Sequence, residues 1–293
     1  MIHVLLTAFV LVYDVTASNP DGITFINELA LGNNSRGVKA LDFSPDGELL
    51  LSVAADPYHT VTIWDWKRNN KLASARANNA EVYSMRFSPF QCYSRDDVPA
   101  HDCEYTLVSL GSRHIKFWTL EPDDSVAVES AKDEKEARAL AQRLGKWKIE
   151  CNAASFGTKA KMQDITSVTT VLDTPADLMN EVAPSSRAVC GTESGSIFVF
   201  TTVEEPRDDD DDEIIPKVAE DPDDEEVRVN KPVKWAPRGN LDFVIKDAHA
   251  GSVSDIAAAG GTNVVASVGK DCLLKIWQLS HFEEGNTLTL RKR

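Results

Sequence analysis

The feature that most constrains this chain is a short strand pattern that occurs four times and closes each time on an aromatic residue. Apolar and polar residues alternate in four segments: 61–66, 114–119, 196–201 and 274–278. Such alternation is typical of a half-buried β-strand. Each segment follows a second short apolar run, and these runs lie at 49–54, 105–110, 187–190 and 264–268. The sequence therefore predicts one β-hairpin repeated four times.

Further strands flank these hairpins. Two of the hairpins follow the phrase Phe-Ser-Pro, at 43–45 and 87–89, and Asp46-Gly47 completes a tight-turn signal in the first case. The alternating segments 38–43 and 82–87 lie before these turns and supply one more strand per unit. A fourth strand is expected after each closing aromatic residue. Four-stranded antiparallel units that repeat with Trp-Asp endings predict an all-β fold, built of β-propeller blades.

The N-terminus contains the apolar run 4–12, which is open to two interpretations. As a secretory signal it would be cleaved near Val15-Thr16-Ala17, but no Lys or Arg precedes it and Asp14 interrupts it. As a strand, Phe9–Asp14 ends where a Trp-Asp dipeptide would fall, with Tyr13 in place of Trp. The strand is the preferred interpretation, and the run is too short for a membrane-spanning helix.

The closing aromatic residues lie further apart than one blade length, because 54, 82 and 77 residues separate positions 64, 118, 200 and 277. Insertions explain the excess. We expect a partial first blade at 1–32, blades at 33–79, 80–125, 146–203 and 233–280, and a tail at 281–293. A charged insertion at 126–145 is expected to contain a short surface helix at 132–144, and an acidic insertion at 204–232 is expected to be disordered because its like charges repel. About four and a half blades suggest a partial propeller or part of a tandem array, because open blades leave strand edges to be covered.

Charge and cysteine content limit the classes of partner. The chain has 31 Lys and Arg against 46 Asp and Glu, a net charge of −15. Nucleic acids and acidic membranes need clustered positive charge, so neither is an expected partner, whereas a basic protein suits the acidic insertion. Five irregularly spaced cysteines are typical of reduced thiols in the cytosol.

Three segments resemble the WD-repeat family, and more closely its echinoderm microtubule-associated protein-like group: 36–43, 60–67 and 110–120. The resemblance implies a non-enzymatic propeller that binds tubulin, microtubules or a cytoskeletal adaptor through its loops. It also implies a cytoplasmic, cytoskeletal location, with the cilium as one such place. Because tubulin is acidic and this chain carries −15, binding through an adaptor meets less electrostatic opposition than direct binding.

The resemblance further implies a structural hydrogen-bond set in the last unit, comprising His249, Ser267, Asp271 and Trp277. In the family, the Asp orients the His, the His bonds the Ser hydroxyl, and the hydroxyl accepts the indole N–H. A hydrolase is the alternative for Ser, His and Asp together. However, Ser267 lies in an apolar strand without a Gly-x-Ser-x-Gly elbow, so neither catalytic residues nor a cofactor are expected.

Two groups of residues have the donor atoms of a metal site but not its spacing. Cys92, His101 and Cys103 carry donors suited to zinc, yet they match no common zinc pattern. The aspartate run 208–212 lacks the Gly and terminal Glu of a calcium loop. We therefore expect no metal site.

Candidate contacts to an acidic partner are the basic residues Lys67, Arg68, Lys71 and Arg113. The simpler interpretation is that these side chains are solvated loop charges, and it has the greater weight. The alternative function is a generic intracellular scaffold, in a ubiquitin-ligase or signalling assembly, with the acidic insertion recruiting a basic partner.

Overall fold

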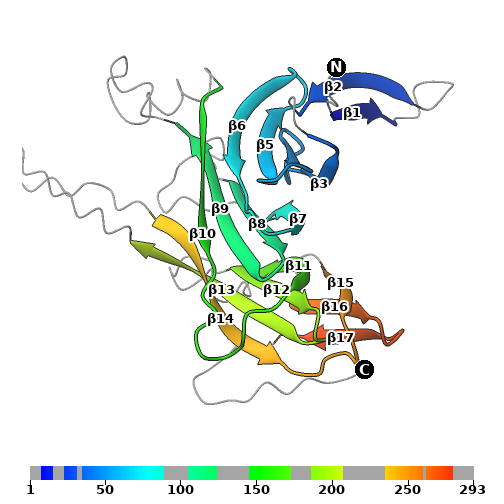
Figure 1. The fold of residues 1–293 in the computed structure, drawn as a ribbon, viewed down its shortest axis with the longest axis vertical. Coiled ribbons are helices and arrows are strands. Elements are labelled where there is room, and N and C mark those ends of the chain that lie inside the picture. Colours follow the sequence, from blue (N-terminus) through cyan, green and yellow to red (C-terminus); the bar gives the residue numbers. More distant parts are fainter. Residues whose placement is uncertain are drawn as a thin grey trace, which may run out of the picture.

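The computed structural model describes residues 8–15, 23–31, 35–88, 105–123, 145–172, 186–206, 235–259 and 262–279. Within these ranges every regular element is a β-strand (Figure 1). The helix expected at 132–144, and most of the acidic insertion, lie outside the described residues. In the described part, no helix has the length and apolarity to cross a membrane.

The strands form five antiparallel sheets in chain order. The N-terminal hairpin contains β1 (Phe9–Asp14) and β2 (Thr24–Ala30). The first blade contains β3 (Val38–Phe43), β4 (Leu50–Ala54), β5 (Thr60–Asp65) and β6 (Asn70–Arg76). The second contains β7 (Val82–Phe87), β8 (Tyr105–Gly111), β9 (His114–Pro122) and β10 (Trp147–Ala153). The third contains β11 (Ile165–Leu172), β12 (Ser186–Thr192), β13 (Ile197–Pro206) and β14 (Trp235–Ile245). The fourth contains β15 (Val253–Ala258), β16 (Val264–Gly269) and β17 (Leu274–Gln278).

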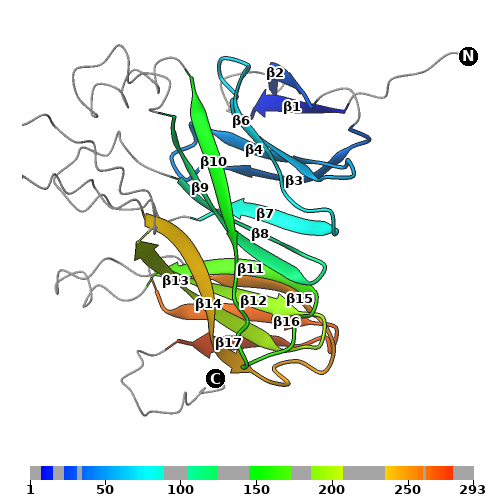
Figure 2. The ribbon, with the colours of Figure 1, turned by 60° about the vertical axis from the view of Figure 1, so that its left-hand side comes forward.

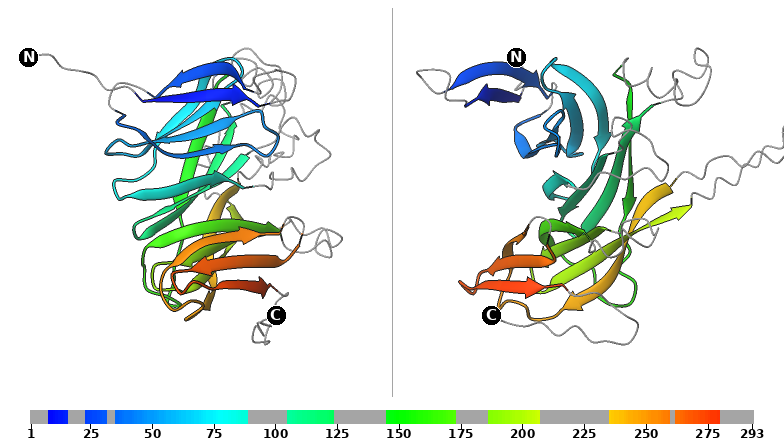
Figure 3. Two further views of the ribbon diagram at one scale, coloured as in Figure 1. Left: turned by 90° about the vertical axis from the view of Figure 1, so that its right-hand side faces the viewer. Right: turned by 180° about the vertical axis from the view of Figure 1, so that it is seen from behind.

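The sheets follow one another around an open arc, with the N-terminal hairpin at one end and the fourth blade at the other (Figures 1 and 3). The predicted fold class, a β-propeller of antiparallel blades, is confirmed. The strands expected at 38–43, 82–87 and 9–14 have the predicted bounds. Period-2 alternation was therefore a sufficient signal for these strands.

Two predicted blade boundaries are wrong. The sequence-based division assigned residues 146–153 and 233–245 to the blade that follows each insertion. In the structure, β10 pairs with β9 and β14 pairs with β13, so both strands complete the blade that precedes the insertion. The reason is that each insertion lies between the third and fourth strands of one blade, and backbone pairing resumes after it in the same sheet.

Neighbouring blades pack face to face, and the third strands of the first three blades each contribute to both neighbouring cores. We call the side of a sheet that faces the next sheet its forward side, and the other its backward side. In β5, Val61 and Ile63 point forward into a core with the second blade. Trp64 points backward into a core with Val10 and Val12 of the N-terminal hairpin. The third strand is therefore buried on both sides, which makes each blade depend on its neighbours.

The three closing tryptophans each donate a hydrogen bond to a serine on the second strand of their blade. Each indole nitrogen lies 2.8 Å from the serine Oγ, in the pairs Trp64–Ser52, Trp118–Ser109 and Trp277–Ser267. In the third blade, Phe200 replaces Trp and packs edge-on against Phe156 and Phe198. Each of the three closing indole nitrogens thus has a partner.

In the fourth blade the hydrogen bonds continue beyond the serine and bring His249, Ser267, Asp271 and Trp277 together. The Ser267 hydroxyl lies 2.7 Å from Nε2 of His249, whose Nδ1 lies 2.9 Å from Oδ1 of Asp271. Trp277 donates to Ser267, so Ser267 donates to Nε2 and Nδ1 donates to the carboxylate. Ser267 is only 1% exposed. The set therefore connects three segments of the blade inside the protein and presents no hydroxyl to a substrate.

Asp271 is also held by the backbone. The amides of Ala250 and Leu273 each donate to its carboxylate over 3.1 Å. Desolvation opposes the charged form, but these hydrogen bonds and the one from His249 outweigh it and lower the pKa of Asp271 to about 2. The carboxylate that orients His249 is therefore ionised at neutral pH.

A first prediction compares two isoleucines at the same position of the third strand. Ile63 is fully buried between two blades, whereas Ile276 is 47% exposed. We expect Ile63→Ala to lower the free energy of unfolding by about 2–5 kcal/mol. Ile276→Ala should change it by no more than about 0.5 kcal/mol, as a surface substitution does. Denaturant unfolding of dilute samples measures both, and equal losses would contradict the two-sided burial of β5.

A second prediction concerns Ser267. Ser267→Ala leaves the indole N–H of Trp277 and Nε2 of His249 without their shared partner, which should cost about 1–3 kcal/mol. The control is Ser254→Ala in β15, because Ser254 is exposed. The same unfolding measurement applies, and a Ser267→Ala loss no larger than that of the control would rule out a structural role.

A third prediction concerns pH. Because the pKa of Asp271 falls to about 2 on folding, its carboxylate stabilises the fold above the unfolded-state pKa of about 3.9. That contribution is lost as the pH falls towards 2. Asp271→Asn should therefore be less stable than the native chain at pH 6, and the difference should shrink steadily between about pH 4 and pH 2. A difference independent of pH would show that the charge of Asp271 does not matter.

Candidate binding faces

Strand order divides the propeller into two rims, one at each end of the strands. In every four-stranded blade, the first-to-second and third-to-fourth connections lie at one end, which we call the insertion face. The second-to-third turns and the links between blades lie at the other end, which we call the turn face. Figure 2 shows the strands of successive blades running between these two ends.

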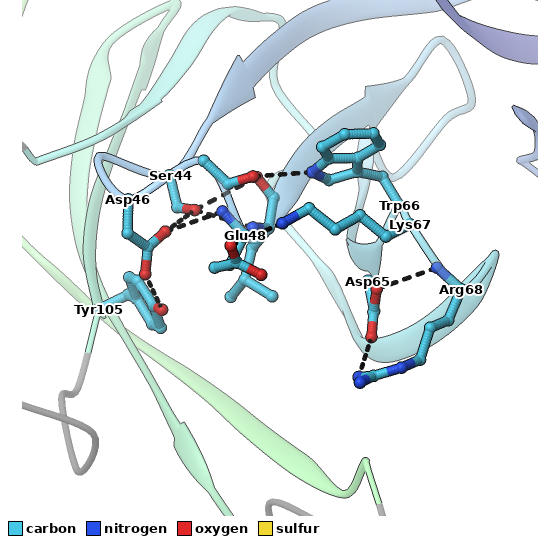
Figure 4. A network of polar contacts seen from close by, with 10 residues as sticks. Ser44, Asp46, Glu48, Asp65, Trp66, Lys67, Arg68 and Tyr105 are labelled. Atoms are coloured by element: carbon cyan, nitrogen blue, oxygen red, sulfur yellow. Dashed lines mark hydrogen bonds and ion pairs between the residues drawn. The ribbon is translucent and has the colours of Figure 1, made fainter. Parts of the chain in front are cut away.

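On the insertion face of the first blade, the two connections are tied together by residues next to the closing tryptophan (Figure 4). Nε1 of Trp66 donates to the carbonyl of Gly47 over 3.0 Å. Nζ of Lys67 lies 2.6 Å from Oε1 of Glu48 and 5.6 Å from the Trp66 ring centroid. The neighbouring Arg68 pairs with Asp65 over 2.9 Å. Lys67 and Arg68 therefore have intramolecular partners.

Asp46 connects this network to the second blade (Figure 4). Its carboxylate accepts hydrogen bonds from the Ser44 hydroxyl and from the Tyr105 hydroxyl at the start of β8, both over 2.5 Å. Partial burial raises the pKa of Asp46, but these bonds and the Glu48 amide outweigh it, so the pKa is lowered. The insertion face of the first two blades is thus held by an ionised carboxylate.

The connections that join strand ends on the insertion face contain most of the chain's acidic sequence. Four segments outside the described residues start and end there, because they join first to second or third to fourth strands: 89–104, 124–144, 173–185 and 207–234. Together they contain 24 Asp and Glu against 10 Lys and Arg, nearly all of the net charge of −15. Both ends of each of these segments are therefore attached to the same side of the propeller.

On the turn face, Asp164 connects the second and third blades. It precedes β11 and accepts hydrogen bonds from the Tyr83 hydroxyl over 2.7 Å and the Ser112 hydroxyl over 3.1 Å. The Tyr83 bond is the main reason why the pKa of Asp164 is lowered, and the same bond raises the pKa of Tyr83. A carboxylate engaged in this way is less available to external partners.

The connections of the turn face also carry five exposed basic side chains that form no ion pair with another described residue: Arg36, Arg113, Lys161, Lys246 and Lys270. They lie before β3, between β8 and β9, between β10 and β11, between β14 and β15, and between β16 and β17. Among the acidic residues of this face, Glu81 pairs with Lys39, and Asp56 accepts backbone amides. Glu193 and Asp247 remain exposed. Free positive charge is therefore distributed along the arc on this face.

The four basic residues singled out from the sequence do not form one cluster. Lys67, Arg68 and Lys71 lie at the third-to-fourth connection of the first blade, on the insertion face. Arg113 lies in the tight turn between β8 and β9, on the turn face, with a positive φ of 57°. Lys71 is exposed and forms no ion pair with a described residue. Only Arg113 thus belongs to the series of free cations.

Sequence reasoning missed the other members of that series and two of the tryptophan–serine bonds. The cations lie in links of ordinary composition, so they could be found only by assigning each link to one end of its blade. Ser52 and Ser109 had a weak signal, since each lies on the second strand before a closing Trp. Their distances to that Trp, 12 and 9 residues, differ and obscure the pattern.

The described residues hold no group of three or more His, Cys, Asp or Glu side chains placed to bind a metal ion. The candidate zinc donors Cys92, His101 and Cys103, and the run 208–212, lie outside the described residues. Cys190, by contrast, is fully buried in the core between the second and third blades, and burial raises the pKa of its thiol.

Comparison with known proteins agrees with this architecture. Residues 24–65 and 242–278 match the family "WD domain, G-beta repeat". Cilia- and flagella-associated protein 44 of Trypanosoma brucei brucei is 33% identical over 86 residues, which are 29% of this chain and 4% of that protein. Echinoderm microtubule-associated protein-like 4 of Mus musculus is 32% identical over 99 residues, which are 33% of this chain and 9% of that protein. The matches thus span less than a tenth of either relative.

Among solved structures, the β-propeller domain of Myceliophteria thermophila Cps50 (Swd1) superimposes with a TM-score of 0.50 at 11% identity. The alignment covers 93% of this chain and 62% of that domain, and it supports the fold alone. The two matched repeat segments include the closing tryptophans Trp64 and Trp277, each of which bonds a buried serine. Two repeats of this chain thus match the WD-repeat family model, and its antiparallel blades have the architecture of a β-propeller.

Proposed function

We propose that this chain is a non-enzymatic, cytoskeletal WD-repeat protein that binds microtubules, or an adaptor on them, through its propeller rims. The observation that carries the proposal is the similarity of its repeats to an echinoderm microtubule-associated protein-like protein and to a cilia- and flagella-associated protein. A rigid scaffold with preformed turns suits such recognition, because little ordering is needed on binding. The proposed location is the cytoplasmic cytoskeleton, including the cilium.

The distribution of charge supports the turn face as the contact to an acidic surface such as tubulin. Free cations such as Arg113, Lys246 and Lys270 lie there, whereas the acidic segments leave from the opposite rim. Exposed charges separated by more than a Debye length, about 10 Å at 0.1 M salt, are largely screened from one another. A partner at the turn face therefore meets local positive charge in spite of the net charge of −15.

A second candidate function is a general scaffold that recruits a basic protein through the insertion face. The segment 207–234 favours it, because it holds twelve acidic residues against five basic ones. Such a segment attracts basic partners over a long range and in a salt-dependent way. The two functions use opposite rims, so variants on each rim distinguish them.

A fourth prediction tests the microtubule contact by charge reversal. The triple variant Arg113→Glu/Lys246→Glu/Lys270→Glu should weaken co-sedimentation with polymerised microtubules at least about 10-fold, since it replaces attraction by repulsion. The matched control Lys67→Glu/Arg68→Glu/Lys71→Glu changes the net charge equally, but on the insertion face, and should pellet like the native chain.

A salt series and circular dichroism complete this experiment. Pelleting of the native chain should weaken as salt rises. If a folded native chain stays in the supernatant at low salt, direct binding fails and an adaptor is required. Equal effects of the two triple variants would show that net charge, and not the turn face, controls the interaction.

A fifth prediction tests the acidic segment. Pro206 of β13 and Trp235 of β14 are paired residues, so the strands can be joined by an Asn-Gly turn in place of 207–234. The shortened chain should retain its stability and bind poly-lysine much more weakly than the native chain, while its microtubule binding is unchanged or stronger. Undiminished poly-lysine binding would rule out this segment as the site for a basic partner.

A further inference from the structure

The forward side of the fourth blade is an apolar sheet surface that no described residue covers. Leu274 and Ile276 of β17 are 65% and 47% exposed. They pair directly with Val268 and Ala266 of β16, so these four side chains share one side of the sheet. Contiguous exposed apolar surface of this kind is unusual in a soluble protein and indicates an interaction site.

The same two positions are buried in every other blade. Counted back from the closing aromatic residue, Leu274 and Ile276 correspond to Val61 and Ile63 in the first blade. The equivalent pairs in the second and third blades are Ile115 with Phe117, and Ile197 with Val199. All six of these side chains are at most 3% exposed, each in a core with the next blade. The forward side of the fourth blade is thus one half of a blade interface.

The other half of such an interface is exposed at the opposite end of the arc. In β1, Val10 and Val12 point forward into the first blade, which leaves Phe9, Leu11 and Tyr13 on the backward side. These three are 47–48% exposed, and Tyr13 packs edge-on against Phe25 with ring centroids 5.7 Å apart. Tyr13 holds the place that Trp64 occupies in the first blade, where the side chain is 5% exposed.

We propose that these two surfaces bind each other between two copies of this chain, the forward side of one fourth blade against the backward side of the next N-terminal hairpin. The occupant is a second copy because each end exposes the side that the other end lacks. Together they would pack forward side on backward side, as all the blade interfaces within the chain do. Two forward sides packed on each other would not reproduce this arrangement. The contact is head-to-tail, so it builds chains of copies or a closed ring.

Charge makes this association depend on salt in a distinctive way. Each copy carries −15, so two copies repel each other, while the proposed contact itself is apolar. Added salt screens the repulsion and leaves the apolar contact intact. Association should therefore strengthen with salt, opposite to the behaviour expected for microtubule binding, so the two proposals fail independently.

The test uses two variants of the full 293-residue chain, each blocking one end. Leu274→Glu/Ile276→Glu removes the forward surface, and Leu11→Glu/Tyr13→Glu removes the backward surface. In analytical ultracentrifugation the native chain should form dimers and larger species as concentration rises. Each variant alone should be monomeric, and an equimolar mixture of the two should form a 1:1 dimer and nothing larger, because one intact surface of each kind remains.

The control is Leu41→Glu/Met162→Glu, which changes two side chains that are each 50% exposed but lie at neither end of the arc. It should associate like the native chain, and circular dichroism should show all variants folded. A native chain that stays monomeric at high concentration and high salt would overturn the proposal. So would a folded single-end variant that still self-associates, or a mixture that remains monomeric.

Discussion

Two-sided burial of the third strand is the constraint on which the rest of this structure depends. In β5, Val61 and Ile63 are buried towards one neighbouring sheet and Trp64 towards the other. A strand with apolar side chains on both sides cannot bury them all against one sheet, so a blade with such a strand needs a neighbour on each side. Because the same third-strand positions are apolar in successive blades, the sheets stack in one direction along the arc, and the forward side of each sheet meets the backward side of the next.

Because the sheet surfaces are buried by this packing, the connections at the ends of the strands are the parts available to bind a partner. The sheet surfaces are used for stability, and the antiparallel order sends alternate connections to opposite rims. Connections that join the first and second or the third and fourth strands can lengthen without disturbing a blade interface, and the acidic segments lie there. The links between blades must instead hold neighbours in place, as Asp164 does through Tyr83 and Ser112. The two rims therefore differ in the length and in the charge of their connections.

The sequence predicted where strands lie, but it did not predict to which blade the strands after the long insertions belong. Alternation placed 38–43 and 82–87 correctly, because each residue's side of the sheet follows directly from its position. It misplaced β10 and β14, since nothing local tells whether a strand after a long insertion returns to the old sheet or starts a new one. The blade to which such a strand belongs is set by backbone pairing, as between Trp147 and Pro122. These residues are far apart in the sequence, and composition does not show that they pair.

The same limit applies to the binding faces. A net charge of −15 suggested that an acidic partner would be repelled, and composition offers no way to correct that inference. Strand order adds what composition lacks, because the rim to which each loop belongs follows from the two strands that it joins. Once the connections are assigned in this way, the acidic segments are seen to join strand ends on the insertion face, whereas the free cations Arg36, Arg113 and Lys270 lie on the turn face. Local charge on a rim, and not the total for the chain, then decides which partner that rim attracts.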